Sequence, residues 1–375
     1  MRISFIIEVK MQGEVVRIDE EPARIAFAED HPLPVKIKVI GIGGAGGNAV
    51  NRLIRAGIDG VDLIAANTDI QSLHESMAPT KVQIGAGITG GHGCGGDPEL
   101  GRQSALEDTE RLHDLLAGAH IVFVTGGFGG GTCTGAGPVI AGLAADAGAL
   151  TIAVIITPFS FLGGRSRRCA ENGIRDIESV VDTLITIPND GLLNVTGEDV
   201  LLEDSFRLAD EALCQAVQGI SDVLTRPGIV NVDFAHLRTL MKGKGTALVG
   251  TGIAQGPNRA VDAAQRAVSN PLLVTPMDGA AAVLINITGS RRSFKLREAK
   301  AAAGIIEEIV CPEDMIFGAV YDDAMGDHMK VTVIATGFAR RETYERGGDA
   351  ASHHRHVEPE KENLDISTFR RWHSK

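Results

Sequence analysis

The sequence has few cysteines, no long apolar run and no leader-like start. Its longest apolar run, Leu150 to Thr157, is far shorter than the roughly 20 residues that a membrane-spanning helix needs. No basic segment followed by an apolar one opens the chain, so a secretory signal is not indicated. The five cysteines lack C-x-x-C spacing, which disfavours a zinc site and a disulfide framework. We therefore expect a cytoplasmic protein.

The sequence also lacks a lysine- or arginine-rich block. Its 36 basic and 48 acidic residues give a net charge of −12, which disfavours nucleic acid and an anionic membrane surface as partners. There is no G-x-x-x-x-G-K-S/T string, so the motif evidence excludes an ordinary P-loop enzyme. The length of 375 residues predicts two domains with extensions.

Glycine, in contrast, is concentrated after one apolar run. The β-type run Ile121 to Val124 leads into a glycine loop, and helical sequence resumes after Pro138. The loop glycines are Gly126, Gly127, Gly129, Gly130 and Gly131. Bare backbone N–H groups, the hydroxyls of Thr132 and Thr134, and the positive end of a following helix suit an anion. The pattern predicts a polyphosphate-binding loop, and a flexible surface loop is the alternative.

Two more glycine-rich stretches occur in an alternating strand and helix pattern. The predicted strand Val35 to Ile40 runs into Gly41-x-Gly43-x-x-Gly46 and a helix, and the strand Val61 to Ala66 precedes Asn67-Thr68-Asp69. A further stretch covers 85–96, and the sequence predicts a helix after it from Pro98 to about Leu116. Alternation of this kind predicts an α/β fold with a parallel sheet and ligand loops at the carboxyl ends of its strands. The G-x-G-x-x-G match alone suggests a dinucleotide oxidoreductase, but several glycine loops favour a nucleoside triphosphate held from several sides.

The segment Leu201 to Thr225 predicts one long helix, because apolar residues recur at three- and four-residue spacing. Phe206 and Asp210 share a face of this helix. Phe206 could stack on a base, and the Asp210 carboxylate could accept hydrogen bonds from guanine. The alternative is that Phe206 belongs to the core and Asp210 is solvated.

Asp233 and His236 stand three residues apart where another helix begins. A carboxylate and an imidazole facing one point are suited to polarise a water molecule. The alternative is that Asp233 only caps the helix, and the spacing does not choose between the two.

Composition divides the chain into six predicted parts. The second half mixes helix and strand signals, and the charged stretch before the last residues predicts a disordered linker. The parts are an N-terminal arm (1–34), a nucleotide-binding domain (35–200), a central helix (201–226), a smaller α+β domain (227–338), the linker (339–363) and a short amphipathic tail (364–375).

Several ordered motifs together resemble the FtsZ family, the bacterial relatives of tubulin, over residues 35–338. Gly129 to Gly135 is similar to the tubulin/FtsZ signature loop, with Cys133 where the family has glycine. Other similar stretches are 41–50, 67–69, 185–190, 216–220, 225–228 and 231–238. The tail 364–375 is similar to the family's C-terminal peptide, although Ser367 and Arg370 depart from it.

The resemblance implies a Rossmann-type GTPase that uses GTP and Mg²⁺ and polymerises head to tail into the Z ring at mid-cell. Each subunit would bind GTP, and the next subunit's loop with Asp233 and His236 would complete the hydrolytic site. The tail would dock on membrane-tethering division proteins. The implied nucleotide contacts are Gly44, Ala45, Gly46, Gly47, Asn48, Gly131, Thr132 and Cys133, with Phe206 and Asp210 on guanine.

Three departures from the family affect the expected activity. His236 replaces an acidic residue, while Leu162 and Ser166 replace a glutamate and an arginine that contact nucleotide. Arg165 or Arg167 could substitute for that arginine. We expect weaker GTP binding and slower hydrolysis, and a structural paralogue that co-assembles with another FtsZ is the alternative.

Overall fold

The computed structural model describes residues 7–11, 14–18, 35–191, 201–226, 228–230, 232–269 and 276–338. The predicted linker and tail, 339–375, lie outside these ranges. The chain divides into two units, Met1–Pro34 and Val35–Lys375. In the first unit, β1 (Ile7–Met11) and β2 (Glu14–Ile18) pair as an antiparallel hairpin.

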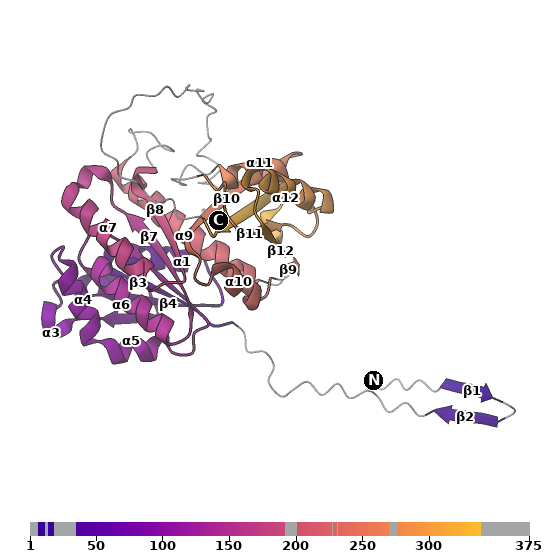
Figure 1. The fold of residues 1–375 in the computed structure, drawn as a ribbon, viewed down its shortest axis with the longest axis horizontal. Helices are drawn as coiled ribbons and strands as arrows, with labels where there is room; N and C mark the ends of the chain where they lie inside the picture. Colours follow the sequence, from indigo (N-terminus) through magenta and orange to yellow (C-terminus); the bar gives the residue numbers. More distant parts are fainter. Residues whose placement is uncertain are drawn as a thin grey trace, which may run out of the picture. The chain divides into compact units, whose positions relative to one another are not determined.

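The second unit is built on an 11-stranded sheet with the order β5-β4-β3-β6-β7-β8-β10-β13-β11-β12-β9 (Figure 1). Six neighbouring strands are parallel: β5 (Thr80–Gln83), β4 (Val61–Asn67), β3 (Ile37–Ile42), β6 (Ile121–Gly127), β7 (Leu150–Thr157) and β8 (Thr183–Pro188). Chain order runs outward in both directions from the β3–β6 pair, as in a doubly wound fold. The predicted parallel-sheet α/β fold is confirmed.

The remaining strands extend the same sheet with mixed directions. β10 (Gly245–Gln255) pairs in parallel with β8 and antiparallel with β13 (His328–Thr336). Beyond them come β11 (Ala282–Gly289), β12 (Asp314–Tyr321) and β9 (Gly228–Val230). One sheet therefore passes through both of the domains predicted for residues 35–338, whose boundaries remain predictions.

Helices cover the parallel strands on both faces because alternate residues of each strand point to opposite sides. Val39 and Phe123 pack with α1 (Gly43–Arg55), α9 (Leu202–Thr225) and α10 (Phe234–Met241). Ile40 and Val124 pack on the other side. The helices of that side are α4 (Pro98–Glu107), α5 (Thr109–Leu116), α6 (Thr132–Asp146) and α7 (Gly164–Glu178).

Two helix boundaries differ from the sequence prediction. α6 begins at Thr132 and continues through Pro138, although a proline inside a helix removes a backbone donor and disfavours the helix. The helix predicted from Pro98 to Leu116 divides into α4 and α5 at Asp108. The Asp108 carboxylate accepts a hydrogen bond from the Gly85 N–H at 2.8 Å, which fixes that turn against a neighbouring loop.

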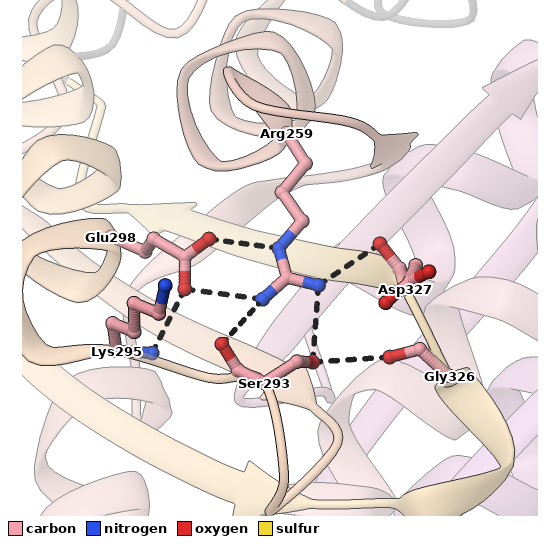
Figure 2. Close-up of polar contacts among 6 residues, drawn as sticks. All are labelled: Arg259, Ser293, Lys295, Glu298, Gly326 and Asp327. Carbon is pink, nitrogen blue, oxygen red and sulfur yellow. Dashed lines mark hydrogen bonds and ion pairs between the residues drawn. The ribbon is translucent and has the colours of Figure 1, made fainter.

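A buried arginine joins the helices of the C-terminal part. Arg259 opens α11 (Arg259–Val268) and is 5% exposed. Figure 2 shows its guanidinium between Glu298 of α12 (Leu296–Val310), Ser293 and the Asp327 carbonyl. All five of its N–H groups find an acceptor at 2.8–3.1 Å. We call this group the Arg259 cluster.

Candidate nucleotide-binding site

Two glycine loops meet at the carboxyl ends of β3 and β6. A side-chain carbon added at Gly43 would lie 3.5 Å from Thr132 Cβ, and one added at Gly127 would lie 3.0 Å from Ala45 Cβ. The starts of α1 and α6 are therefore neighbours at the point where strand order reverses, which is the ligand position of doubly wound sheets. The predicted groups 44–48 and 131–133 are brought together here.

The glycines of the first loop have two different tasks. A side-chain carbon at Gly46 would lie 2.7 Å from the Thr125 carbonyl oxygen, so α1 packs over β6 only with glycine there. Added carbons at Gly44 and Gly47 would meet nothing within 4 Å. No side chain caps the start of α1 or of α6. Their first N–H groups therefore remain available to an anion.

A third loop closes the crevice from the side. A side-chain carbon at Gly131 would lie 2.6 Å from Cys94 Cβ, so the stretch 91–96 packs directly on the glycine loop of α6. Thr68, which follows β4, places its Oγ1 atom 2.8 Å from Thr132 Oγ1. The next residue, Asp69, is committed to α2 (Ile70–Glu75): its carboxylate accepts from Ser72 Oγ and the Gln71 N–H, and the Ser72 hydrogen bond leads in lowering its pKa.

Cys133 has a buried thiol, 4% exposed, that lies against Gly126. Burial raises the pKa of this thiol, so it is a neutral packing group. Any contact that Cys133 makes with a ligand has to come from its backbone N–H. All five cysteines are free thiols.

Phe206 and Asp210 on α9 flank the carboxyl edge of the sheet, where the parallel strands end. Phe206 is 43% exposed and packs edge-on to buried Phe159, with ring centroids 5.5 Å apart. Phe159 follows the end of β7, so Phe206 lies beside the carboxyl edge and outside the core. Asp210 is half-buried near Arg52 of α1. Burial raises the pKa of Asp210 to about 6, against the opposing charge of Arg52.

Asp233 and His236 lie at the opposite edge of the sheet, where the parallel strands begin, which we call the amino edge. Phe234 packs on His120 with ring centroids 5.9 Å apart, and His120 accepts the Lys36 N–H. Both His120 and Lys36 immediately precede a parallel strand. The 7-residue strand β6 separates this edge from the glycine loops by roughly 20 Å. The structure therefore does not bring Asp233 and His236 to the nucleotide loops of their own chain.

Asp233 caps the helix that carries His236. Its Oδ1 atom accepts the His236 N–H at 2.8 Å and lies 3.0 Å from His236 Nδ1. Both side chains are about two-thirds exposed, at 65% and 66%. Asp233 therefore caps the helix, and the exposed pair remains open to contact with another molecule, so capping does not decide between the two interpretations.

The departures at 162 and 166 lie beside the α6 loop. A side-chain carbon at Gly129 would lie 3.0 Å from the Ser166 carbonyl oxygen, so the start of α7 adjoins the glycine loop. Leu162 is 49% exposed. Arg167 pairs with Glu171 at 3.0 Å, and Arg165 is exposed. That one of these two arginines substitutes for the arginine of the family stays a prediction.

One candidate residue was not singled out by the sequence patterns. Asn189, directly after β8 at the same carboxyl edge, is 4% exposed, and its Oδ1 atom has no hydrogen-bond partner in the described part of the chain. A buried acceptor without a donor is costly, so a ligand hydroxyl or amine is a fitting partner. The sequence signals for it are its position after a parallel strand and its place in the family-like stretch 185–190.

The described residues form neither a protein-built metal cage nor a membrane span. Among residues 35–191, 201–226, 228–230, 232–269 and 276–338, no three histidine, cysteine or acidic side chains are grouped to hold a metal ion. The helices of the same ranges include none that is long and apolar enough to cross a bilayer.

Comparison with known proteins identifies relatives of both halves of the sheet. Residues 36–197 match the model of the Tubulin/FtsZ family, GTPase domain, and residues 245–339 match that of the FtsZ family, C-terminal domain. Cell division protein FtsZ of Pseudomonas putida is 48% identical over 317 residues, which are 84% of this chain and 79% of that protein.

Solved structures show the same architecture. An empty FtsZ dimer of M. jannaschii has a TM-score of 0.76 and 36% identity, covering 81% of this chain and 88% of that one. A GTPγS-bound protofilament of a CetZ protein from Haloferax volcanii has a TM-score of 0.69 and 22% identity, covering 82% and 94%. The second likeness concerns the fold alone.

Proposed function

The chain belongs to the FtsZ family of tubulin-like GTPases, and from this premise we propose that it is a cell-division GTPase that polymerises head to tail. The observation that carries the proposal is the meeting of two uncapped helix starts with Phe206 and Asp210 at one edge of the sheet. The dinucleotide oxidoreductase suggested by the first glycine loop alone is not favoured, because both family models match this chain.

GTP fits the crevice part by part. The phosphates would contact the loop backbones at Gly44, Ala45, Gly46, Gly47, Gly131, Thr132 and Cys133, with Asn48 at the mouth of the crevice. Phe206 would stack on guanine, and Asp210 would accept its N1–H and exocyclic amine. Adenine lacks the N1–H, so Asp210 would select guanine.

Mg²⁺ would arrive with the nucleotide and be held mainly by phosphate oxygens, as is usual for this ion. This fits a site in which Asp69 already caps α2 and the described residues form no cage. Bound there, the ion would neutralise phosphate charge during hydrolysis.

A second subunit would complete the hydrolytic site. Because Asp233 and His236 lie at the amino edge and the glycine loops at the carboxyl edge, copies stacked along the strand direction bring the Asp233 pair of one onto the loops of the next. Asp233 would then orient the attacking water, with His236 in place of the second acidic residue of the family. The helix α9 is 24 residues long, or about 36 Å, which is more than the roughly 20 Å that separates the two edges.

The cellular setting follows from the family. We propose that the filaments form the Z ring in the cytoplasm at mid-cell, and that residues 364–375 dock on membrane-tethering division proteins. This tail lies outside the described residues, and the proposal rests on its likeness to the FtsZ C-terminal peptide.

The experiment that tests the proposal records light scattering and phosphate release together, on purified protein with Mg²⁺ and either GTP or GDP. Assembly with phosphate release in GTP alone is the expected result. Assembly without release would instead favour the structural paralogue. The absence of both assembly and phosphate release would contradict the proposed activity.

A further inference from the structure

Three polar side chains meet behind the α6 glycine loop. Thr68 Oγ1 and Thr132 Oγ1 are 2.8 Å apart, and Cys94 Sγ lies 3.4 Å from the first and 3.6 Å from the second. Thr68 is 0% exposed and Cys94 is 4% exposed. The three come from separate segments: Thr68 follows β4, Cys94 belongs to the stretch 91–96, and Thr132 begins α6.

The chemistry of the three groups determines which of them donates to which. Each hydroxyl and the thiol has one hydrogen to donate, and sulfur is a weak acceptor. When Cys94 donates to Thr68 and Thr68 donates to Thr132, the Cys94 sulfur is the one acceptor left for the Thr132 hydrogen among the described residues. That contact, at 3.6 Å, is the longest of the three. The Thr132 hydroxyl therefore loses little by donating to an oxygen outside the triangle.

Thr132 is placed to make that outward contact. It is the first residue of α6 and is half-buried, and Gly43 of the other glycine loop adjoins it. Thr68 is held in position by its own backbone, because its carbonyl accepts the Gly93 N–H and the Thr89 hydroxyl, both at 3.3 Å. The donor to Thr132 is thus fixed before any ligand arrives.

We propose that Thr68 and Cys94 are positioning residues, which orient the Thr132 hydroxyl so that it donates to a nucleotide phosphate. The proposal rests on the proposed function, because it takes the glycine loops to be the polyphosphate site. Preorganised donors bind an anion more tightly because their orientation costs no entropy on binding.

The test compares variants that remove or keep single hydroxyls. Thr68→Val removes the central donor, and Thr68→Ser keeps it. Thr109→Val is the control, because it removes a hydroxyl at the start of α5 that donates to the Leu106 carbonyl and takes no part in the triangle. Calorimetric titration measures Kd for GTP and for guanosine, which has no phosphate. Circular dichroism and thermal melting check that each variant is folded.

The expected pattern is selective for phosphate. Thr68→Val should weaken GTP binding by about fivefold to tenfold and leave guanosine binding unchanged. Thr68→Ser and Thr109→Val should stay within about twofold of the wild-type Kd. Cys94→Ala should weaken GTP binding less than Thr68→Val, because Thr68 keeps its own hydrogen.

Three outcomes would overturn the inference. The Kd of Thr68→Val for GTP could equal that of the wild type, its affinity for guanosine could fall as much as its affinity for GTP, or its Kd for GTP could equal that of Thr68→Ser. Failure of the wild-type protein to bind GTP would instead contradict the proposed function, so the two failures are distinguishable.

Discussion

Arg259 and Asp210 are both charged groups that are at least partly buried, and they differ in how many partners they have. The fully partnered one has a structural role, and the other belongs to the candidate site. Arg259 has an acceptor for every N–H and a carboxylate partner 2.8 Å away. In the described part of the chain, Asp210 is opposed only by the more distant charge of Arg52 and accepts no hydrogen bond. The Arg259 guanidinium has no N–H left for a ligand, whereas the Asp210 carboxylate is free to accept hydrogen bonds from one.

The pKa values follow the same division. Burial alone would raise the pKa of Glu298, but hydrogen bonds from Arg259 and the Lys295 N–H bring it below its usual value. For Asp210, burial dominates and raises the pKa to about 6. The carboxyl that lacks a partner is therefore the one whose charge remains to be stabilised by guanine.

Breaking the completed cluster should have the largest effect. Arg259→Ala leaves Glu298 buried at 12% exposure without its partner, and removing one member of a buried ion pair costs about 3 to 5 kcal/mol. The free energy of unfolding in urea measures this loss. The control is Arg266→Ala, whose exposed guanidinium donates to the Ile253 carbonyl and should cost far less. Equal effects of the two changes would contradict the structural assignment of Arg259.

Removing the unpartnered charge should have the opposite consequence for stability. Asp210→Asn should not destabilise the free protein at pH 7, yet it should weaken GTP binding by about 1.5 to 3 kcal/mol, because a charged acceptor of two guanine donors is lost. Unfolding and calorimetric titration on the same preparation separate the two effects. A variant that binds GTP normally would show that Asp210 does not hold guanine.

The raised pKa of Asp210 makes both properties depend on pH. Its protonated form favours the fold, so its contribution to stability is complete below pH 3.8 and is lost as pH rises through about 6. Guanine requires the carboxylate, so GTP affinity should rise by about tenfold from pH 5 to pH 7. The titration is repeated at each pH on the wild type and on Asp210→Asn. The same slope in both proteins would mean that another group is responsible.

The smallest change concerns the exposed pair at the other edge. His236→Asp restores a second carboxylate to the loop that would contact the next subunit's nucleotide, so GTP turnover should rise several-fold. His236→Asn is the matched control, since it removes the imidazole without adding charge. Phosphate release at equal filament mass is the readout, and an unchanged rate in His236→Asp would show that this position does not limit hydrolysis.

The sequence was sufficient for the elements that form the crevice, because glycine loops between apolar strands and the periodicity of α9 are local patterns. The spacing of residues could not predict where Asp233 lies, because spacing along the chain does not show at which edge of a sheet a helix begins. The sequence could not assign a role to Asn189 for a related reason. Whether its Oδ1 atom is buried and lacks a donor depends on which other segments pack around it. The break at Asp108 also depends on a distant partner, Gly85.

The most direct test of the account mixes two inactive variants. Asp233→Ala subunits keep the crevice but lack the carboxylate that serves a neighbour, whereas Phe206→Ala/Asp210→Ala subunits lack the guanine contacts but keep Asp233. If each nucleotide is hydrolysed between two subunits, the mixture should release phosphate from GTP faster than the sum of the two variants alone. Release no greater than that sum, in mixtures that still assemble, would contradict a site shared between subunits.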